Sequence, residues 1–223
     1  MGSSTSVPMR VIQGRRFDYV VKVAKNSAEL RSVASLRSRV FREDYDRVIK
    51  MDDSLKGVQR DRVLSTVEWD RLERRTQGGL VCVGAWLGEK CEVELEERIL
   101  EESDRSAQLV GGGPVIGALD VVFGADGAED LPQDVRSSGQ GLLAYVSNVG
   151  VLGPCRCTGV AGSLLNFAVE AAATRSASRV YTHAIDLHGR SSLYHKHGFR
   201  RVSEAAADLE GHSGAVLLCK ELR

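Results

Sequence analysis

Blocks of apolar and polar residues along the first third of the chain predict a strand followed by two helices. Residues 17–23 alternate between apolar and polar side chains with a period of two, which predicts an opening strand. Asn26 or Ser27 can cap a helix that runs over about residues 28–41. A second helix is predicted over residues 61–75, because its apolar residues recur at helical spacing.

The rest of the chain continues this alternation. Further strands are predicted over residues 80–87, 115–123, 142–151, 179–185 and 214–219. One helix is predicted over the apolar-periodic stretch of residues 164–172, after a turn at residues 156–161. A short helix is predicted to span residues 190–197, and residues 125–141 are expected to form a polar loop. Strands separated by helices in this order predict an α/β or α+β domain with a mixed sheet.

The length of 223 residues is enough for one well-buried core and argues against two independent domains. We therefore expect a flexible segment over residues 1–16 and a single domain over residues 17–223. An acidic insert at about residues 88–113 interrupts that domain, and its composition allows either a helix or a loop.

Charge and cysteine content exclude several classes of protein. Lys plus Arg and Asp plus Glu each number 30, so the net charge of zero gives no general attraction for nucleic acid or anionic membranes. No apolar run approaches the roughly 18–20 residues that span a bilayer. Five cysteines at irregular spacing do not form a disulfide framework and fit a reducing compartment.

The segment Arg-Cys-Thr-Gly-Val-Ala at residues 156–161 lies between the strand 142–151 and the helix that follows it. The first backbone N–H groups of a helix have no partner inside the helix and carry a partial positive charge. Gly159, Ala161 and Gly162 carry at most a methyl group, so a ligand can approach that backbone closely. The pattern indicates an anion-binding site suited to a pyrophosphate.

This segment resembles motif A, Arg/Gln-x-x-Gly-x-Gly/Ala, of the GNAT superfamily of N-acetyltransferases, which bind acetyl-CoA there. Residues 193–199, Leu-Tyr-His-Lys-His-Gly-Phe, resemble the later Leu-Tyr-x-Lys-x-Gly-Phe signature of the same superfamily, in the right order and spacing. The resemblance extends over about residues 17–222. It implies the α+β GNAT fold, a central mixed, mostly antiparallel twisted sheet flanked by helices, whose splayed strands form the acetyl-CoA cleft.

The resemblance also implies which residues contact acetyl-CoA. Backbone groups of Val149 and Val151 would pair with the pantetheine arm, and a backbone N–H within residues 119–121 would stabilise the oxyanion. The pyrophosphate would be held by Arg156, Gly159, Val160, Ala161 and Gly162. No metal ion is expected, since Cys155 and Cys157 are closer in sequence than the cysteines of common zinc sites.

Transfer of an acetyl group from a thioester to an amine needs a neutral amine and an acid for the departing thiolate. Tyr194 matches a tyrosine that many GNATs place near the sulfur, although a buried aromatic on a short amphipathic helix is the competing interpretation. Asp120 stands where some GNATs carry a carboxylate base, and an ordinary solvated strand residue is its alternative. His183 is a further candidate base, for which a core histidine is the favoured interpretation.

The sequence therefore predicts an acetyl-CoA-dependent N-acetyltransferase that acts on a primary amine. Residues 36–43 and 145–151 look most like the plastid branch of plants and algae, which implies protein N-termini or lysines as acceptors and a chloroplast location, otherwise the cytoplasm. The lack of acidic residues over residues 1–17 is also typical of transit peptides. The alternatives are a small-amine N-acetyltransferase, for arylalkylamines or polyamines, and a non-catalytic CoA-binding module.

Overall fold

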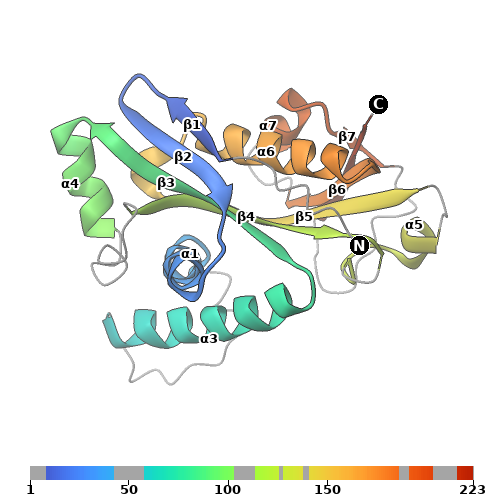
Figure 1. The fold of residues 1–223 in the computed structure, drawn as a ribbon, viewed down its shortest axis with the longest axis horizontal. Coiled ribbons are helices and arrows are strands. Elements are labelled where there is room, and N and C mark those ends of the chain that lie inside the picture. Colours follow the sequence, from blue (N-terminus) through green and yellow to red (C-terminus); the bar gives the residue numbers. More distant parts are fainter. Residues whose placement is uncertain are drawn as a thin grey trace. The chain divides into compact units, whose positions relative to one another are not determined.

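The computed structural model describes residues 9–42, 58–102, 114–125, 128–137, 141–185, 191–202 and 215–222. Eight strands within these ranges form one sheet in the order β1-β2-β3-β4-β5-β6-β8-β7 (Figure 1). The strands are β1 (Arg10–Gln13), β2 (Phe17–Val23), β3 (Val81–Cys91), β4 (Val115–Phe123), β5 (Leu142–Val151), β6 (Ala177–Ile185), β7 (Arg200–Arg201) and β8 (Ala215–Glu221).

The sheet is mixed, as the sequence predicted. Antiparallel pairing joins β1 to β2, β2 to β3, β6 to β8 and β7 to β8, whereas β5 and β6 run parallel. The helices are α1 (Ser27–Val40), α3 (Val58–Gln77), α4 (Val93–Glu102), α5 (Gln133–Ser137), α6 (Val160–Thr174) and α7 (Ser191–Lys196). The predicted fold class is confirmed.

Most of the predicted elements are present, and the differences lie in short or polar segments. The strand β1 forms within residues 10–13, where the pattern of side chains predicted none. The acidic insert contains α4, whose Leu95 and Ile99 are buried while its glutamates are largely exposed. The predicted loop over residues 125–141 contains the short helix α5.

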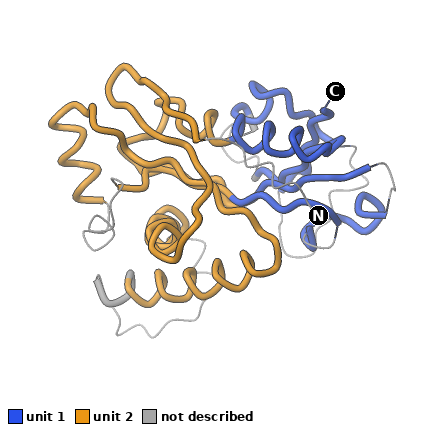
Figure 2. The backbone as a smooth tube through the Cα atoms, viewed as in Figure 1, with its two compact units in different colours: residues 1–7, 120–147, 165–223 blue, residues 8–119, 148–164 orange. Residues whose placement is uncertain are grey.

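The chain divides into two compact units, shown in Figure 2. Unit 2 contains residues 8–119 and 148–164, and unit 1 contains residues 1–7, 120–147 and 165–223. The strands β4 and β5 and the helix α6 each continue from one unit into the other.

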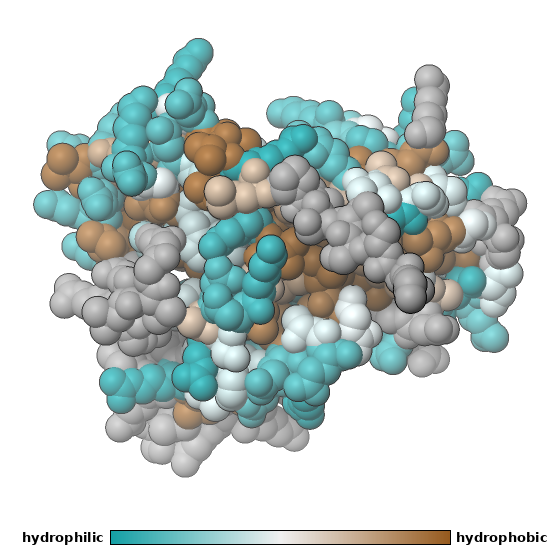
Figure 3. Space-filling view, in the orientation of Figure 1, coloured by the Kyte–Doolittle hydropathy of each residue, from teal (hydrophilic) through white to brown (hydrophobic). Residues whose placement is uncertain are grey.

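In unit 2, α1 packs against α3, which runs below it in the view of Figure 1. Figure 3 shows mostly hydrophilic surface along α3, which fits the many charged residues of this helix. On the buried side of the pair, Arg37 of α1 donates to the carboxylate of Glu68 of α3 at 3.2 Å. Both side chains are at most 2% exposed, so this ion pair lies fully inside the unit.

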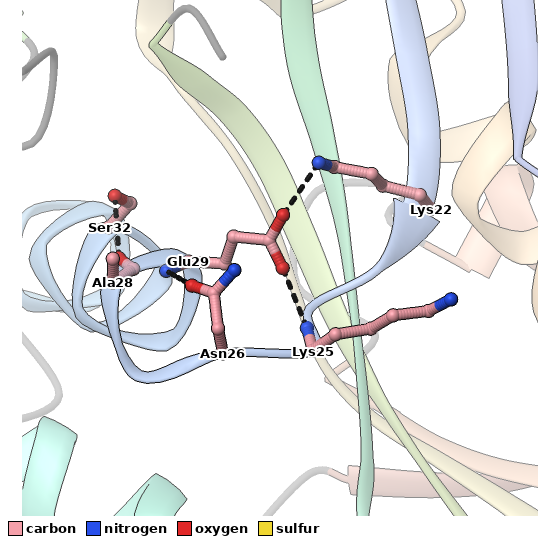
Figure 4. A network of polar contacts seen from close by, with 6 residues as sticks. All are labelled: Lys22, Lys25, Asn26, Ala28, Glu29 and Ser32. Atoms are coloured by element: carbon pink, nitrogen blue, oxygen red, sulfur yellow. Dashed lines mark hydrogen bonds and ion pairs between the residues drawn. The ribbon is translucent and has the colours of Figure 1, made fainter. Parts of the chain in front are cut away.

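The start of α1 is fixed by a polar network at the end of β2 (Figure 4). The side chain of Asn26 accepts a hydrogen bond from the Glu29 N–H at 2.9 Å, so Asn26, one of the two cap residues that the sequence offered, caps the helix. The Glu29 carboxylate accepts from Lys22 Nζ at 2.6 Å and from the Lys25 N–H at 2.7 Å. Partial burial by itself would raise the pKa of Glu29, but the hydrogen bonds from Lys22 and Lys25 together outweigh it, so the pKa is lowered overall.

Unit 1 has its own apolar core on the face of the sheet that α5 covers. Its buried members are Ala128, Leu131, Val135, Leu143, Tyr145, Tyr181 and Leu217. The core thus joins residues of β5, β6 and β8 to the segment that contains α5.

The buried ion pair gives a stability prediction. The substitution Arg37→Met leaves the Glu68 carboxylate buried without this partner, so we expect it to lower the free energy of unfolding by about 3–5 kcal/mol. The double substitution Arg37→Met with Glu68→Leu should restore most of that loss, because no charge remains buried. Denaturant unfolding followed by circular dichroism measures both values.

Arg16 and Glu92 provide the matched control, since they form an exposed ion pair at 2.9 Å in the same unit. The substitution Arg16→Met should leave the unfolding midpoint nearly unchanged. An Arg37→Met variant as stable as the wild type would contradict a structural role for the buried pair.

Candidate functional site

The predicted anion-binding turn lies in unit 2, between the end of β5 and the start of α6. A 3₁₀ helix, η2 (Gly153–Cys155), comes first, and the Thr158 hydroxyl then donates to the Cys155 carbonyl at 2.6 Å. Cys157 and Gly159 adopt left-handed backbone conformations, with φ of 62° and 96°. The chain therefore reverses tightly before α6, and it does so with glycine at the more extreme φ.

The first helical hydrogen bond of α6 runs from the Ser163 N–H to the Gly159 carbonyl at 3.0 Å. The N–H groups of residues 160–162 precede this bond and have no acceptor four residues back within the helix. No acidic residue occupies the first turn of α6, so the positive end of its dipole is not neutralised there. A Cβ on Gly159 would meet no atom within 4 Å, which leaves room beside these groups for a ligand.

The helix α6 approaches the sheet closely because β4 carries a glycine at the point of contact. A Cβ on Gly117 would lie 2.9 Å from Cγ1 of Val160 and 3.1 Å from Cδ1 of Leu164. Both of these side chains are buried. The start of α6 is thus held against β4 by direct packing.

The predicted pyrophosphate and pantetheine residues lie together in this part of unit 2. Arg156 is exposed, and its Nε donates to the Val151 carbonyl at 3.2 Å, which holds the guanidinium beside the end of β5. Val151 is buried, Val149 is half-buried, and Asn148 just before them has a left-handed φ of 54°. Ala161 and Gly162 are half-buried in the first turn of α6.

Gly150, between the two predicted pantetheine contacts, packs against the end of α1. A Cβ at Gly150 would lie 3.0 Å from Cγ1 of Val40 and 3.1 Å from Cζ of Phe41. The end of α1 therefore forms an apolar wall beside this stretch of β5.

The predicted acid, Tyr194, belongs to unit 1. It is 9% exposed, and its ring packs edge-to-face on Phe199 with centroids 5.9 Å apart. Burial raises the pKa of Tyr194 in spite of a hydrogen bond with Thr182 that lowers it, so the phenol is protonated at neutral pH. A protonated phenol can donate a proton, and the same surroundings also suit a buried structural aromatic.

The predicted base, Asp120, is also in unit 1 and is completely buried on β4. The alternative of a solvated strand residue is therefore wrong for this position. Its catalytic role stays a prediction.

A tyrosine and histidine pair in unit 1 was missed by the sequence analysis, which favoured a core role for His183 and gave Tyr145 none. The Tyr145 hydroxyl lies 2.9 Å from His183 Nδ1, across the parallel strands β5 and β6. The rings meet edge-on, with centroids 5.7 Å apart. A phenol hydrogen-bonded to an imidazole can pass a proton in either direction, so this pair is a second candidate base.

The two cysteines of the turn differ in environment. Cys155 is buried, and this burial raises the pKa of its thiol to about 12, whereas Cys157 is exposed. Within the described ranges, no group of three or more His, Cys, Asp or Glu residues has a geometry that could hold a metal ion. The helices described also include none that is long and apolar enough to cross a membrane.

No protein-family model matches the sequence, and no curated protein matches it. Solved structures do match in fold. A GNAT-family acetyltransferase from Listeria monocytogenes 4b F2365 matches with a TM-score of 0.56 and 14% sequence identity, over 96% of this chain and 100% of that one. NAA60 of Arabidopsis thaliana, solved in complex with acetyl-CoA, matches with a TM-score of 0.51 and 18% identity, over 92% and 98%.

A chain of the NatC complex, solved with Gag peptide and CoA, matches with a TM-score of 0.54 and 13% identity, over 92% of this chain and 99% of that one. Identities this low relate folds and do not by themselves transfer an activity. The chain therefore has the fold of the GNAT acetyltransferases.

Proposed function

We propose that this protein is an N-acetyltransferase that transfers acetyl directly from acetyl-CoA to a primary amine. The observation that carries the proposal is the geometry at the start of α6. The N–H groups of three residues precede the first hydrogen bond of this helix. Gly159, which has free space where a Cβ would stand, and Arg156 come just before them in the sequence. That arrangement suits the diphosphate of CoA, whose negative charges gain hydrogen bonds and favourable electrostatics together.

In the proposed reaction the neutral amine attacks the thioester carbonyl and the carbon–sulfur bond breaks. The amine loses a proton to a base, and the CoA thiolate gains one from an acid. We assign the acid to Tyr194, whose phenol is protonated. Asp120 is the base predicted from sequence, and the pair of Tyr145 and His183 is its competitor.

For the acceptor we propose protein N-terminal α-amino groups or lysine ε-amino groups, with the chloroplast as the location. Support comes from the likeness of residues 36–43 and 145–151 to the plastid branch of GNATs. A chain with this fold also occurs in the NatC complex, which was solved bound to Gag peptide and CoA. A small amine acceptor is the second candidate, and a CoA-binding module without catalysis is the third.

The test of the function is acetyl transfer from isotopically labelled acetyl-CoA to a peptide library and an amine panel, with mass spectrometry to locate the label. We expect label on peptide N-termini or lysines, and loss of most turnover in Tyr194→Phe with little change in CoA affinity. Binding of CoA without transfer to any acceptor would favour the non-catalytic module. An absence of CoA binding would refute the proposal.

Gly159 allows a direct test of the binding turn. The substitution Gly159→Ala places a side chain at a φ of 96°, which costs L-residues about 1–2 kcal/mol, and it should weaken acetyl-CoA binding strongly in calorimetric titrations. Gly79, after α3, has a φ of 94° and equally open surroundings. Gly79→Ala should therefore lower stability by a similar amount without changing acetyl-CoA affinity, and equal affinities in the two variants would contradict the assignment.

The two candidate bases can be distinguished by pH–rate profiles of Asp120→Asn and His183→Gln. Loss of the base should remove the acidic limb of the profile for kcat and lower the plateau about 10²–10⁴-fold, as is typical of general base catalysis. The variant of the other candidate should keep that limb. If both variants keep the limb, neither residue acts as the base.

A further inference from the structure

We infer that Tyr19 of β2 is a positioning residue for the turn that begins α6. Its hydroxyl oxygen shares a hydrogen bond with Ser163 Oγ at 2.8 Å, although the two residues are 144 positions apart in the sequence. Both belong to unit 2. The inference rests on the proposed function, because it concerns the same anion-binding turn.

The surroundings of Tyr19 on β2 fix the position of its phenol ring. The residue is 3% exposed, and its backbone is paired with Ile12 of β1 on one side and Leu87 of β3 on the other. Its ring also contacts that of Phe17, with centroids 5.7 Å apart. A tyrosine fixed in this way presents its hydroxyl at a defined place, and a buried hydroxyl of this kind usually finds one partner.

Ser163 links that hydroxyl to the turn. Its N–H closes the first helical bond of α6 by donating to the Gly159 carbonyl, while its side chain reaches Tyr19. Side chains in a helix point toward the N-terminus, so the Ser163 hydroxyl lies over the turn that contains Gly159. The same residue is therefore tied to the turn by its backbone and to the sheet by its side chain.

The bond complements the packing of α6 on Gly117. That packing fixes how close Val160 and Leu164 approach β4, but apolar contacts are not directional. The Tyr19 hydrogen bond adds a directional restraint on the first turn of the helix. Through it, Tyr19 influences where the N–H groups of residues 160–162 point, without touching the ligand itself.

The experiment measures CoA affinity by calorimetry and steady-state kinetics for the full chain and three variants, Tyr19→Phe, Ser163→Ala and their combination. We expect each single variant to raise the Kd for CoA and the KM for acetyl-CoA about three- to tenfold, the usual net worth of one hydrogen bond, with kcat little changed. The double variant should bind no more weakly than either single one, because either substitution breaks the same bond.

Ser32→Ala is the matched control. Ser32 lies in α1 of the same unit, and its hydroxyl donates to the Ala28 carbonyl at 3.0 Å. Loss of that hydroxyl should leave CoA affinity unchanged. Additive effects of Tyr19→Phe and Ser163→Ala, or a folded Tyr19→Phe variant with wild-type CoA affinity, would overturn the inference.

The CoA affinity of the wild type distinguishes failure of the proposed function from failure of the role given to Tyr19. If the wild type binds CoA and Tyr19→Phe binds it equally well, the proposed function stands and the role of Tyr19 is refuted. If the wild type does not bind CoA, the proposed function fails and the role of Tyr19 fails with it. Should Tyr19→Phe not fold, Ser163→Ala alone decides, since it removes the same bond from the other partner, which is half-buried.

Discussion

The close packing of α6 on β4 at Gly117 is the constraint on which the candidate binding site depends. A Cβ at this position would come within 2.9 Å of Val160, so only glycine lets the helix start where it does. The N–H groups that precede the first helical bond belong to the residues that make this contact or adjoin it. The geometry of the candidate anion-binding turn is therefore a consequence of helix and sheet packing.

Electrostatics around this turn combine favourable and opposing contributions. The helix start and Arg156 supply positive potential, and α6 carries no acid in its first turn. The acidic helix α4 supplies negative charge that opposes this potential. It packs on η2, and a Cβ on Gly153 would lie 3.1 Å from the Glu102 carboxylate. Because fixed backbone dipoles at short range carry the proposed recognition, a chain with zero net charge can still bind a polyanionic ligand.

Hydrophobic periodicity was sufficient to predict the longer elements, since β2, α1, β4, β5 and α6 each bury one face or all of their length. The strand β1 escaped prediction because its four residues show no alternation and are mostly exposed. The turn itself was predictable because strand, glycine and helix follow one another locally. The contacts that support the turn could not be predicted, because Gly117 and Tyr19 are far from the turn in the sequence and contact it only in the folded sheet.

The candidate catalytic residues were likewise predictable only where a local sequence signature marks them. Tyr194 was proposed from a local signature. The pairing of Tyr145 with His183, which are 38 positions apart in the sequence, depends on the register of the parallel strands β5 and β6. The burial of Asp120 likewise depends on what covers β4, which alternation within one strand does not reveal.

The central claim is that the start of α6 binds the diphosphate of CoA, and a crystal structure of the protein with CoA tests it most directly. We predict phosphate oxygens within hydrogen-bonding distance of the N–H groups of residues 160–162, with the Arg156 guanidinium nearby. Well-ordered CoA whose phosphates contact other parts of the protein and leave this turn empty would contradict it.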